Sequence, residues 1–186
     1  GNGGGRLEEA VEIANFFLPR GKVIVTTKGK TKQASNTYKT LREPLDLDIP
    51  ITVLVNGATA SASEILSGAF QDFDRAVIVG SRTFGKGLVQ TTRPLPYGGV
   101  MKLTTSKYYI PSGRCVQAID YKHRNEDGSV GTIPDSLTTV FHTAAGREVR
   151  DGGGVMPDIE VKQEKLPNII FFLVRDNLIF DYATQY

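Results

Sequence analysis

Two polar residues have surroundings that could support chemistry. Ser61 lies in the segment Asn56–Ile65, which is made almost wholly of small residues, and Lys86 lies between Gly85 and Gly87. A serine at the start of a helix can attack a carbonyl, because unpaired backbone amides there stabilise the developing oxyanion. A lysine can act as the general base for such a serine. The two residues together indicate nucleophilic acyl transfer.

A lysine acts as a base at neutral pH only where its ammonium form is destabilised. At the unperturbed pKa of ~10.4, about one lysine in a few thousand is neutral at pH 7. Lowering that pKa to ~7–8 requires roughly 3–4 kcal/mol, normally through burial away from carboxylates. The loop 82–87 contains no acidic residue, and we expect Phe84 to supply an apolar wall. We also expect Gln90 to accept an N–H of Lys86 on its amide oxygen and so orient the amine.

Each motif also has a simpler interpretation. Ser61 and Glu64 have the spacing of a capping box, in which the glutamate reaches back to the serine amide. The segment Gly80–Lys86 matches a phosphate-binding loop through its lysine, but Gly87 stands where that loop needs a hydroxyl for magnesium. The residues that follow are strand-like instead of helical. We therefore expect a tight turn with backbone packed closely on both sides of Lys86, and not a nucleotide site.

The elements that would position these residues alternate between helix and strand. Apolar periodicity predicts helices over 7–18 and around 65–73, and β-branched runs predict strands over 22–28, 51–55 and 76–79. The run 51–55 has the profile of a strand buried on both faces. Ser61 follows one strand and Lys86 the next, so neighbouring parallel strands would bring both to one sheet edge. This order predicts an α/β layer architecture with largely parallel pairing.

The remaining segments carry weaker signals. Residues 29–48 are polar and predict a surface excursion, 88–94 and 100–110 predict a hairpin, 155–161 a last strand, and 168–184 a helix. The apolar cluster within 169–180 is more typical of core than of interface, although exposure would make it a self-association surface.

Composition excludes several classes of protein. The 186 residues suffice for one domain, and a net charge of +2 does not suggest a nucleic-acid partner. One cysteine, Cys115, and two histidines exclude a disulfide and a Cys/His zinc cage, and nothing indicates a cofactor. The longest apolar run near the C-terminus, 169–174, is too short to span a bilayer. The opening Gly1–Gly5 reads like the middle of a loop, so we expect a fragment without its leading sequence.

Three motifs identify a family. They are Asn2–Gly5, Thr59–Glu64 followed by Gln71–Asp72, and Thr83–Gln90, with 25 residues from Ser61 to Lys86 and four more to Gln90. With these motifs the sequence resembles the carboxyl-terminal processing (tail-specific) serine proteases, strongly over 1–110 and loosely beyond. The resemblance implies an α/β, crotonase/Clp-protease-like core with layered β-sheets and flanking helices, here with its N-terminal part and any PDZ domain missing.

The resemblance also assigns roles to individual residues. It implies that Ser61, rather than Ser63, is the nucleophile, that Lys86 is the base and that Gln90 orients it. The oxyanion hole would be formed by the N–H groups of Ala62 and of an opening glycine, for which we take Gly4. Asp72 matches an acidic position of the family, and we expect it to have a supporting, structural role.

The implied activity is that of a serine endopeptidase with a Ser-Lys dyad. It would cleave polypeptides through an acyl-enzyme, near C-termini and outside the cytoplasm, in the periplasm, with no metal or cofactor. The alternative is a non-catalytic peptide- or ligand-binding module on the same fold. We expect a protease core over residues 1–165 and a C-terminal helical segment over 166–186, packed on the core or on a partner. The sequence leaves open whether the protein forms a homo-oligomer.

Overall fold

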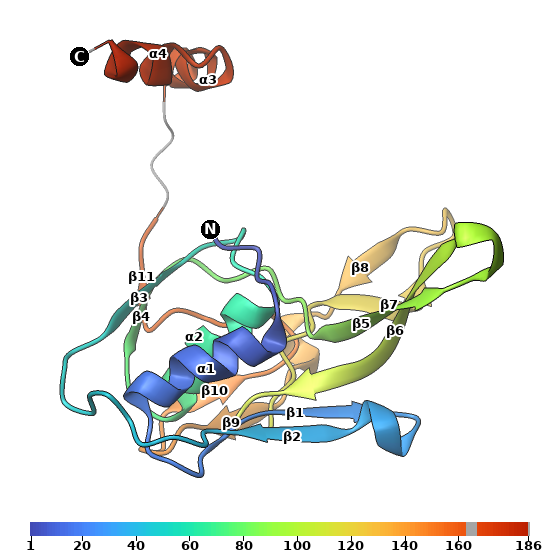
Figure 1. Cartoon of the computed structure of the whole chain (residues 1–186). Helices are drawn as coiled ribbons and strands as arrows, with labels where there is room; N and C mark the ends of the chain where they lie inside the picture. The colour runs from blue at the N-terminus through green and yellow to red at the C-terminus, as the bar shows by residue number, and fades with distance from the viewer. Residues whose placement is uncertain (163–166, 186) are drawn as a thin grey trace.

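The computed structural model describes residues 1–162 and 167–185 (Figure 1). Its helices are α1 (Leu7–Phe17), α2 (Ala62–Asp72), α3 (Asn168–Arg175) and α4 (Leu178–Thr184). Its strands are β1 (Val23–Gly29), β2 (Asn36–Lys39), β3 (Thr52–Val55), β4 (Val77–Gly80), β5 (Leu88–Pro94), β6 (Val100–Tyr109), β7 (Ile119–Arg124), β8 (Val130–Thr132), β9 (Val140–His142), β10 (Glu148–Arg150) and β11 (Ile159–Glu160).

The strands form two main sheets of different character. A four-stranded antiparallel sheet has the order β2-β1-β6-β5, and a three-stranded parallel sheet has the order β11-β4-β3. The predicted hairpin over 88–110 is confirmed as β5 and β6. The prediction of largely parallel pairing is wrong for β1, because β1 pairs antiparallel with both β2 and β6. Strand β2 was missed, since its four residues are mostly exposed and lack an apolar alternation.

Helices α1 and α2 form the centre of the core, in contact with each other and with β1 (Figure 1). Each buries one apolar stripe, as its periodicity predicted. The buried apolar residues of these elements are Ala10, Val11, Ala14, Ile24, Val25, Ala62, Ile65, Ala69 and Phe70. This packing fixes the direction of α2, and therefore the place of Ser61 immediately before its first residue.

Strand β3 differs from its prediction in burial. Val55 is buried and Val53 half-buried, whereas Leu54 is 76% exposed. The prediction of burial on both faces is wrong because β3 is the edge strand of a three-stranded sheet that presents only one face to the core. The pairing of β3 with β4 does hold, and it brings the residues after both strands to the same sheet edge.

The C-terminal segment is helical but not part of the core. The predicted single helix over 168–184 is interrupted at Asn177, whose φ is +56°, so α3 and α4 are separate and pack against each other. No residue of either helix is buried; Phe171, for example, is 66% exposed. The expectation that this apolar cluster is core is therefore wrong among the described residues. Its packing on the core or a partner stays a prediction, and the predicted boundary at 165/166 lies outside the described residues.

Candidate active site

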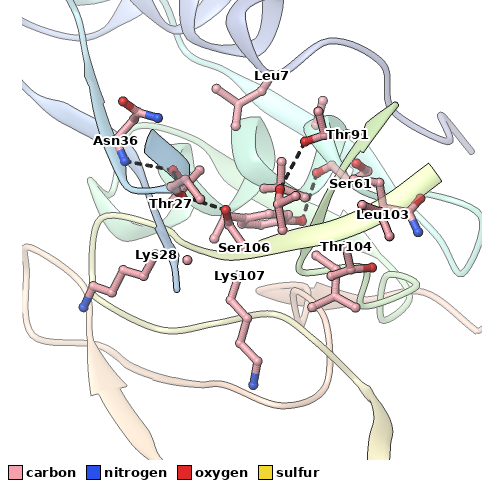
Figure 2. A pocket seen from close by; sticks show the side chains of 18 of the residues that line it. Leu7, Thr27, Lys28, Asn36, Ser61, Thr91, Leu103, Thr104, Ser106 and Lys107 are labelled. Atoms are coloured by element: carbon pink, nitrogen blue, oxygen red, sulfur yellow. Dashed lines mark hydrogen bonds between the residues drawn. The ribbon is translucent and has the colours of Figure 1, made fainter. Parts of the chain in front are cut away.

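An open groove of about 1230 Å³ passes the N-terminus of α2 and the β5–β6 hairpin. Figure 2 shows Ser61 among the side chains that line it, with Leu7 from α1 and Thr91 and Leu103 from the hairpin. Lys86 and Gln90 line the same groove. The structure thus brings Ser61, Lys86 and Gln90, which the sequence pattern singled out separately, to one concave surface.

Ser61 has a strained backbone. It occupies the N-cap position of α2 with φ 60° and ψ −121°, whereas an ordinary N-cap residue is extended. Its N–H donates to Glu64 Oε2 over 2.8 Å, so the glutamate half of the predicted capping box is present. Positive φ is disfavoured for a residue with a Cβ, and such strain is concentrated at functional sites. A serine on a strained strand-to-helix turn is also how other hydrolases expose a nucleophile.

The turn that carries Lys86 is held by close backbone contacts. A Cβ on Gly85 would lie 2.4 Å from the Cβ of Ala118, and Gly85 has φ +84°. A Cβ on Gly87 would lie 2.8 Å from the backbone nitrogen of Gln117. The prediction of backbone packed on both sides of Lys86 is confirmed. The chain then enters β5, so no helix follows the lysine as a phosphate-binding loop would require.

Phe84 does not form the expected wall beside Lys86. Phe84 is 48% exposed, and it lines a separate cavity of about 320 Å³ together with Ala118 and Pro134. That prediction is wrong because the turn directs consecutive side chains to different sides. Lys86 is half-buried, and the hairpin and the N-terminus of α2 line the groove around it.

Glu64 connects the two candidate catalytic segments, a role that the sequence analysis missed. Its Oε2 accepts the N–H groups of Ser61 and Lys86, each over 2.8 Å. Its Oε1 accepts the Gly85 N–H over 2.7 Å and the Thr83 hydroxyl over 2.5 Å. The capping-box spacing could reveal the first of these hydrogen bonds, whereas the other three depend on contact with a distant turn.

The Glu64 carboxyl is fully buried, and this burial raises its pKa, while the four donated hydrogen bonds oppose the shift. A carboxylate from another element therefore lies against the Lys86 turn. The turn itself has no acidic residue, but α2 supplies one.

The side chains of the proposed dyad are not joined by hydrogen bonds. Among the described residues, none connects Ser61 Oγ with Lys86 Nζ, and none connects Gln90 with Lys86; Gln90 is exposed on β5. The two residues are instead connected indirectly, because the backbone N–H groups of Ser61 and Lys86 both donate to Glu64 Oε2.

The predicted oxyanion donors lie next to each other. A Cβ on Gly4 would be 2.5 Å from Ala60 O and 2.9 Å from Ala62 N, so only glycine fits there. The Ala62 N–H begins α2 and has no acceptor among the described residues, as expected at a helix N-terminus. The Gly4 N–H donates to Asn2 Oδ1 over 3.0 Å, and the neighbouring Gly5, unlike Gly4, lines the groove.

Asp72 lies at the other end of α2 from Ser61. Its carboxylate pairs with Arg114 at 2.9 Å, and both side chains are only 1% exposed. Oδ2 also accepts the Ser112 N–H over 2.9 Å. Burial raises the pKa of the Asp72 carboxyl, although Arg114 opposes this. These contacts fasten the loop after β6 to the end of α2, at a distance of about one helix length from the groove.

Charge is distributed unevenly over the groove. Its lining contains seven Lys and Arg side chains and one glutamate, Glu8, in a chain whose net charge is +2. The groove is therefore predominantly positive.

No group of three or more His, Cys, Asp or Glu residues in the described part of the chain could hold a metal ion. Cys115 is half-buried, and this burial raises the pKa of its thiol. Within the same residues, no helix combines the length and apolar character needed to cross a membrane.

Comparisons with known proteins agree with the geometry. A family model described as peptidase family S41 matches residues 1–135. The carboxy-terminal-processing protease of Bartonella bacilliformis is 45% identical over 118 residues, which cover 63% of this chain and 27% of the relative. A Staphylococcus aureus (strain N315) protein named probable CtpA-like serine protease is 45% identical over 117 residues, 62% of this chain and 23% of the relative.

Solved structures give the same result. The photosystem II D1 C-terminal processing protease superposes with a TM-score of 0.62 at 30% identity, covering 94% of this chain and 36% of that one. The chain spans about a quarter of the length of the curated relatives it matches. Since the family model matches well over half of its residues, the chain belongs to peptidase family S41, and it has the mixed α/β fold of that family.

Proposed function

We propose that this chain carries the catalytic part of a serine endopeptidase that uses Ser61 as nucleophile and Lys86 as general base. The observation that carries this proposal is the strained Ser61, which begins α2 in the same groove as Lys86 and shares one carboxylate oxygen with it. Membership of a peptidase family supports the assignment.

The reaction would proceed through an acyl-enzyme. The neutral amine of Lys86 takes the proton of Ser61 Oγ as this oxygen attacks the substrate carbonyl carbon. The ammonium then gives that proton to the leaving amine as the peptide bond breaks, which leaves an ester on Ser61. A water molecule, deprotonated by Lys86, hydrolyses the ester and restores the serine hydroxyl. Every proton is accounted for within the dyad and the solvent, so no cofactor takes part in these steps.

The supporting roles follow the same arrangement. The Ala62 N–H, together with an amide of the Gly4–Gly5 turn, would stabilise the tetrahedral oxyanion. The Gly4 N–H would first have to leave Asn2, whereas Gly5 already faces the groove. Gln90 would orient the Lys86 amine through its amide oxygen, without adding a negative charge. Asp72 would support the fold from the far end of α2.

Polypeptide is the proposed substrate, cut near the C-terminus. The names of the relatives from Bartonella bacilliformis and of the solved D1 protease describe such processing for those proteins. An extended chain could add as a strand along the β5–β6 hairpin, whose residues line the groove. The resemblance to proteases that usually act outside the cytoplasm supports a periplasmic setting, which cell fractionation would test.

Labelling with a fluorophosphonate tests the nucleophile. Intact-mass measurement should show one adduct on the wild type and none on Ser61→Ala, while Ser63→Ala, two residues away on the same turn, should still be labelled. Cleavage of a peptide should rise with pH, because the base acts only as a free amine, and Lys86→Arg should abolish it because arginine stays protonated. Labelling that persists in Ser61→Ala, or cleavage that persists in Lys86→Arg, would remove that residue from the mechanism.

A second candidate is a peptide-binding module without catalysis. The specific observation in its favour is that no hydrogen bond joins the side chains of Ser61 and Lys86 in the described structure. This candidate predicts saturable peptide binding, with no adduct and no cleavage, in a protein that is folded by calorimetry. The labelling experiment therefore separates the two functions.

A further inference from the structure

Tyr108 lies at the meeting point of the two candidate catalytic segments. The residue is only 1% exposed, and its hydroxyl donates to the backbone carbonyl of Ser61 over 3.2 Å and to that of Lys86. A phenol has a single proton, so the two carbonyls share it. One buried hydroxyl therefore joins the residues that we propose as nucleophile and base.

The position of this hydroxyl is set by the antiparallel sheet. Tyr108 pairs with Thr27 of β1, and its N–H donates to Gly87 O over 3.0 Å. Sheet pairing on one side and the Lys86 turn on the other hold the tyrosine backbone. The ring extends from this fixed strand into the core, so its oxygen is a fixed point for both loops.

The tyrosine complements the carboxylate of Glu64. Glu64 Oε2 accepts the N–H groups of Ser61 and Lys86, and the Tyr108 hydroxyl donates to their carbonyls. In both Ser61 and Lys86, therefore, Glu64 holds the backbone N–H and Tyr108 holds the backbone carbonyl. This leaves the Ser61 and Lys86 side chains as the parts that can still rotate toward each other.

We propose that Tyr108 is a positioning residue whose hydroxyl fixes the separation of the Ser61 and Lys86 backbones. The proposal rests on the proposed Ser-Lys function. Tyr108→Phe would keep the ring in the core and remove only the shared donor. A merely structural hydroxyl would affect stability alone, whereas a positioning hydroxyl would affect turnover by the folded enzyme.

The test compares Tyr108→Phe with Tyr109→Phe. Tyr109 is the next residue on the same strand; its ring lies 4.6 Å from Lys28 Nζ, and its hydroxyl makes no hydrogen bond among the described residues. For both variants, kcat and KM are measured on one peptide, with the folded fraction taken from thermal melts. For Tyr108→Phe we expect kcat to fall about 10- to 100-fold, because small misplacements of reacting groups have effects of this size. KM should change by less than about twofold, since substrate contacts are intact. Tyr109→Phe should match the wild type.

An unchanged kcat in folded Tyr108→Phe would overturn the proposal, even if its melting temperature were lower. A wild type whose cleavage equals that of Ser61→Ala would instead overturn the proposed function. In that case, crystal structures of the wild type and Tyr108→Phe decide the positioning role. A changed distance between the Ser61 and Lys86 carbonyl oxygens supports it, and an unchanged distance refutes it.

Discussion

The backbone amides of Ser61 and Lys86 donate to the same atom, Glu64 Oε2, each over 2.8 Å. These residues are 25 positions apart and belong to different elements. Glu64 is buried and accepts four hydrogen bonds in all. The relative position of Ser61 and Lys86 is therefore fixed by a residue of the core and does not depend on two surface loops alone.

Glu64→Gln should therefore damage both stability and turnover. The amide would present N–H groups to at least one pair of donors and leave them unpaired, at about 1–3 kcal/mol for a buried group. The measurements are the free energy of unfolding in urea and kcat per folded molecule. Glu9→Gln, on the exposed face of α1, is the control and should change neither. Wild-type kcat in Glu64→Gln would show that the shared carboxylate does not position the dyad.

Gly85→Ala should destabilise the protein more than Gly128→Ala does. Both glycines have a positive φ, +84° and +80°, so each substitution carries backbone strain of about 1–2 kcal/mol. Only Gly85 has neighbours within contact distance of an added Cβ, which adds about 1–3 kcal/mol of overpacking. Urea unfolding of the two variants isolates the packing contribution. Equal losses of unfolding free energy would mean that the segment beside Gly85 shifts to accommodate the added Cβ at no energetic cost.

Asp72→Asn should act on stability rather than on chemistry. It leaves Arg114 charged and buried without its partner, a loss of about 3–5 kcal/mol. Asp135→Asn breaks the exposed pair with Arg82, whose side chains are 70% and 43% exposed, and should lose about 0–1 kcal/mol. Thermal melting ranks the two variants. Activity per folded molecule should survive in both, and its selective loss in Asp72→Asn would give the carboxylate a catalytic role.

Stability at alkaline pH should depend on Tyr108. Burial raises the pKa of this phenol well above its ordinary value, with a smaller contribution from Glu64. The folded state therefore holds the proton more tightly than the unfolded state does. The resulting stabilisation is complete below the unfolded pKa of about 10 and is lost as pH rises from there toward the folded value.

The corresponding measurement is the melting temperature between pH 9 and pH 11. The wild type should lose stability more steeply over this range than Tyr108→Phe, which lacks the titrating group. Tyr97→Phe, at a fully exposed position, should follow the wild type. Identical slopes in the wild type and Tyr108→Phe would contradict burial of the hydroxyl.

Features carried by short stretches of sequence could be predicted. Apolar periodicity predicted α1 and α2, and two strand-like runs joined across a turn signal predicted the β5–β6 hairpin. The glycines on either side of Lys86 indicated a turn with tight backbone contacts. The wrong predictions concern neighbours far away in sequence. Leu54 is exposed because β3 is an edge strand, and Phe84 faces a different cavity from Lys86.

The same distinction between local sequence signals and contacts distant in sequence applies to the candidate site. The types and spacing of Ser61, Lys86 and Gln90 indicated chemistry, and the structure brings all three to one groove. The roles of Glu64 and Tyr108 could not be predicted. A glutamate three residues after a serine indicates a helix cap, and a tyrosine in a strand indicates packing. Neither pattern reveals the hydrogen bonds to the Lys86 turn, because that turn is distant in sequence and comes into contact only in the folded chain.

The turn before Lys86 is held by hydrogen bonds to a residue much later in the sequence. Thr83 exchanges hydrogen bonds with Val155, from the Val155 N–H to the Thr83 hydroxyl and from the Thr83 N–H to the Val155 carbonyl, over 2.7 and 3.1 Å. A nascent chain that has emerged only as far as residue 150 already contains Ser61 and Lys86 but cannot close this loop. Closure of the loop before Lys86 therefore requires a residue that lies 72 positions further along the chain than Thr83.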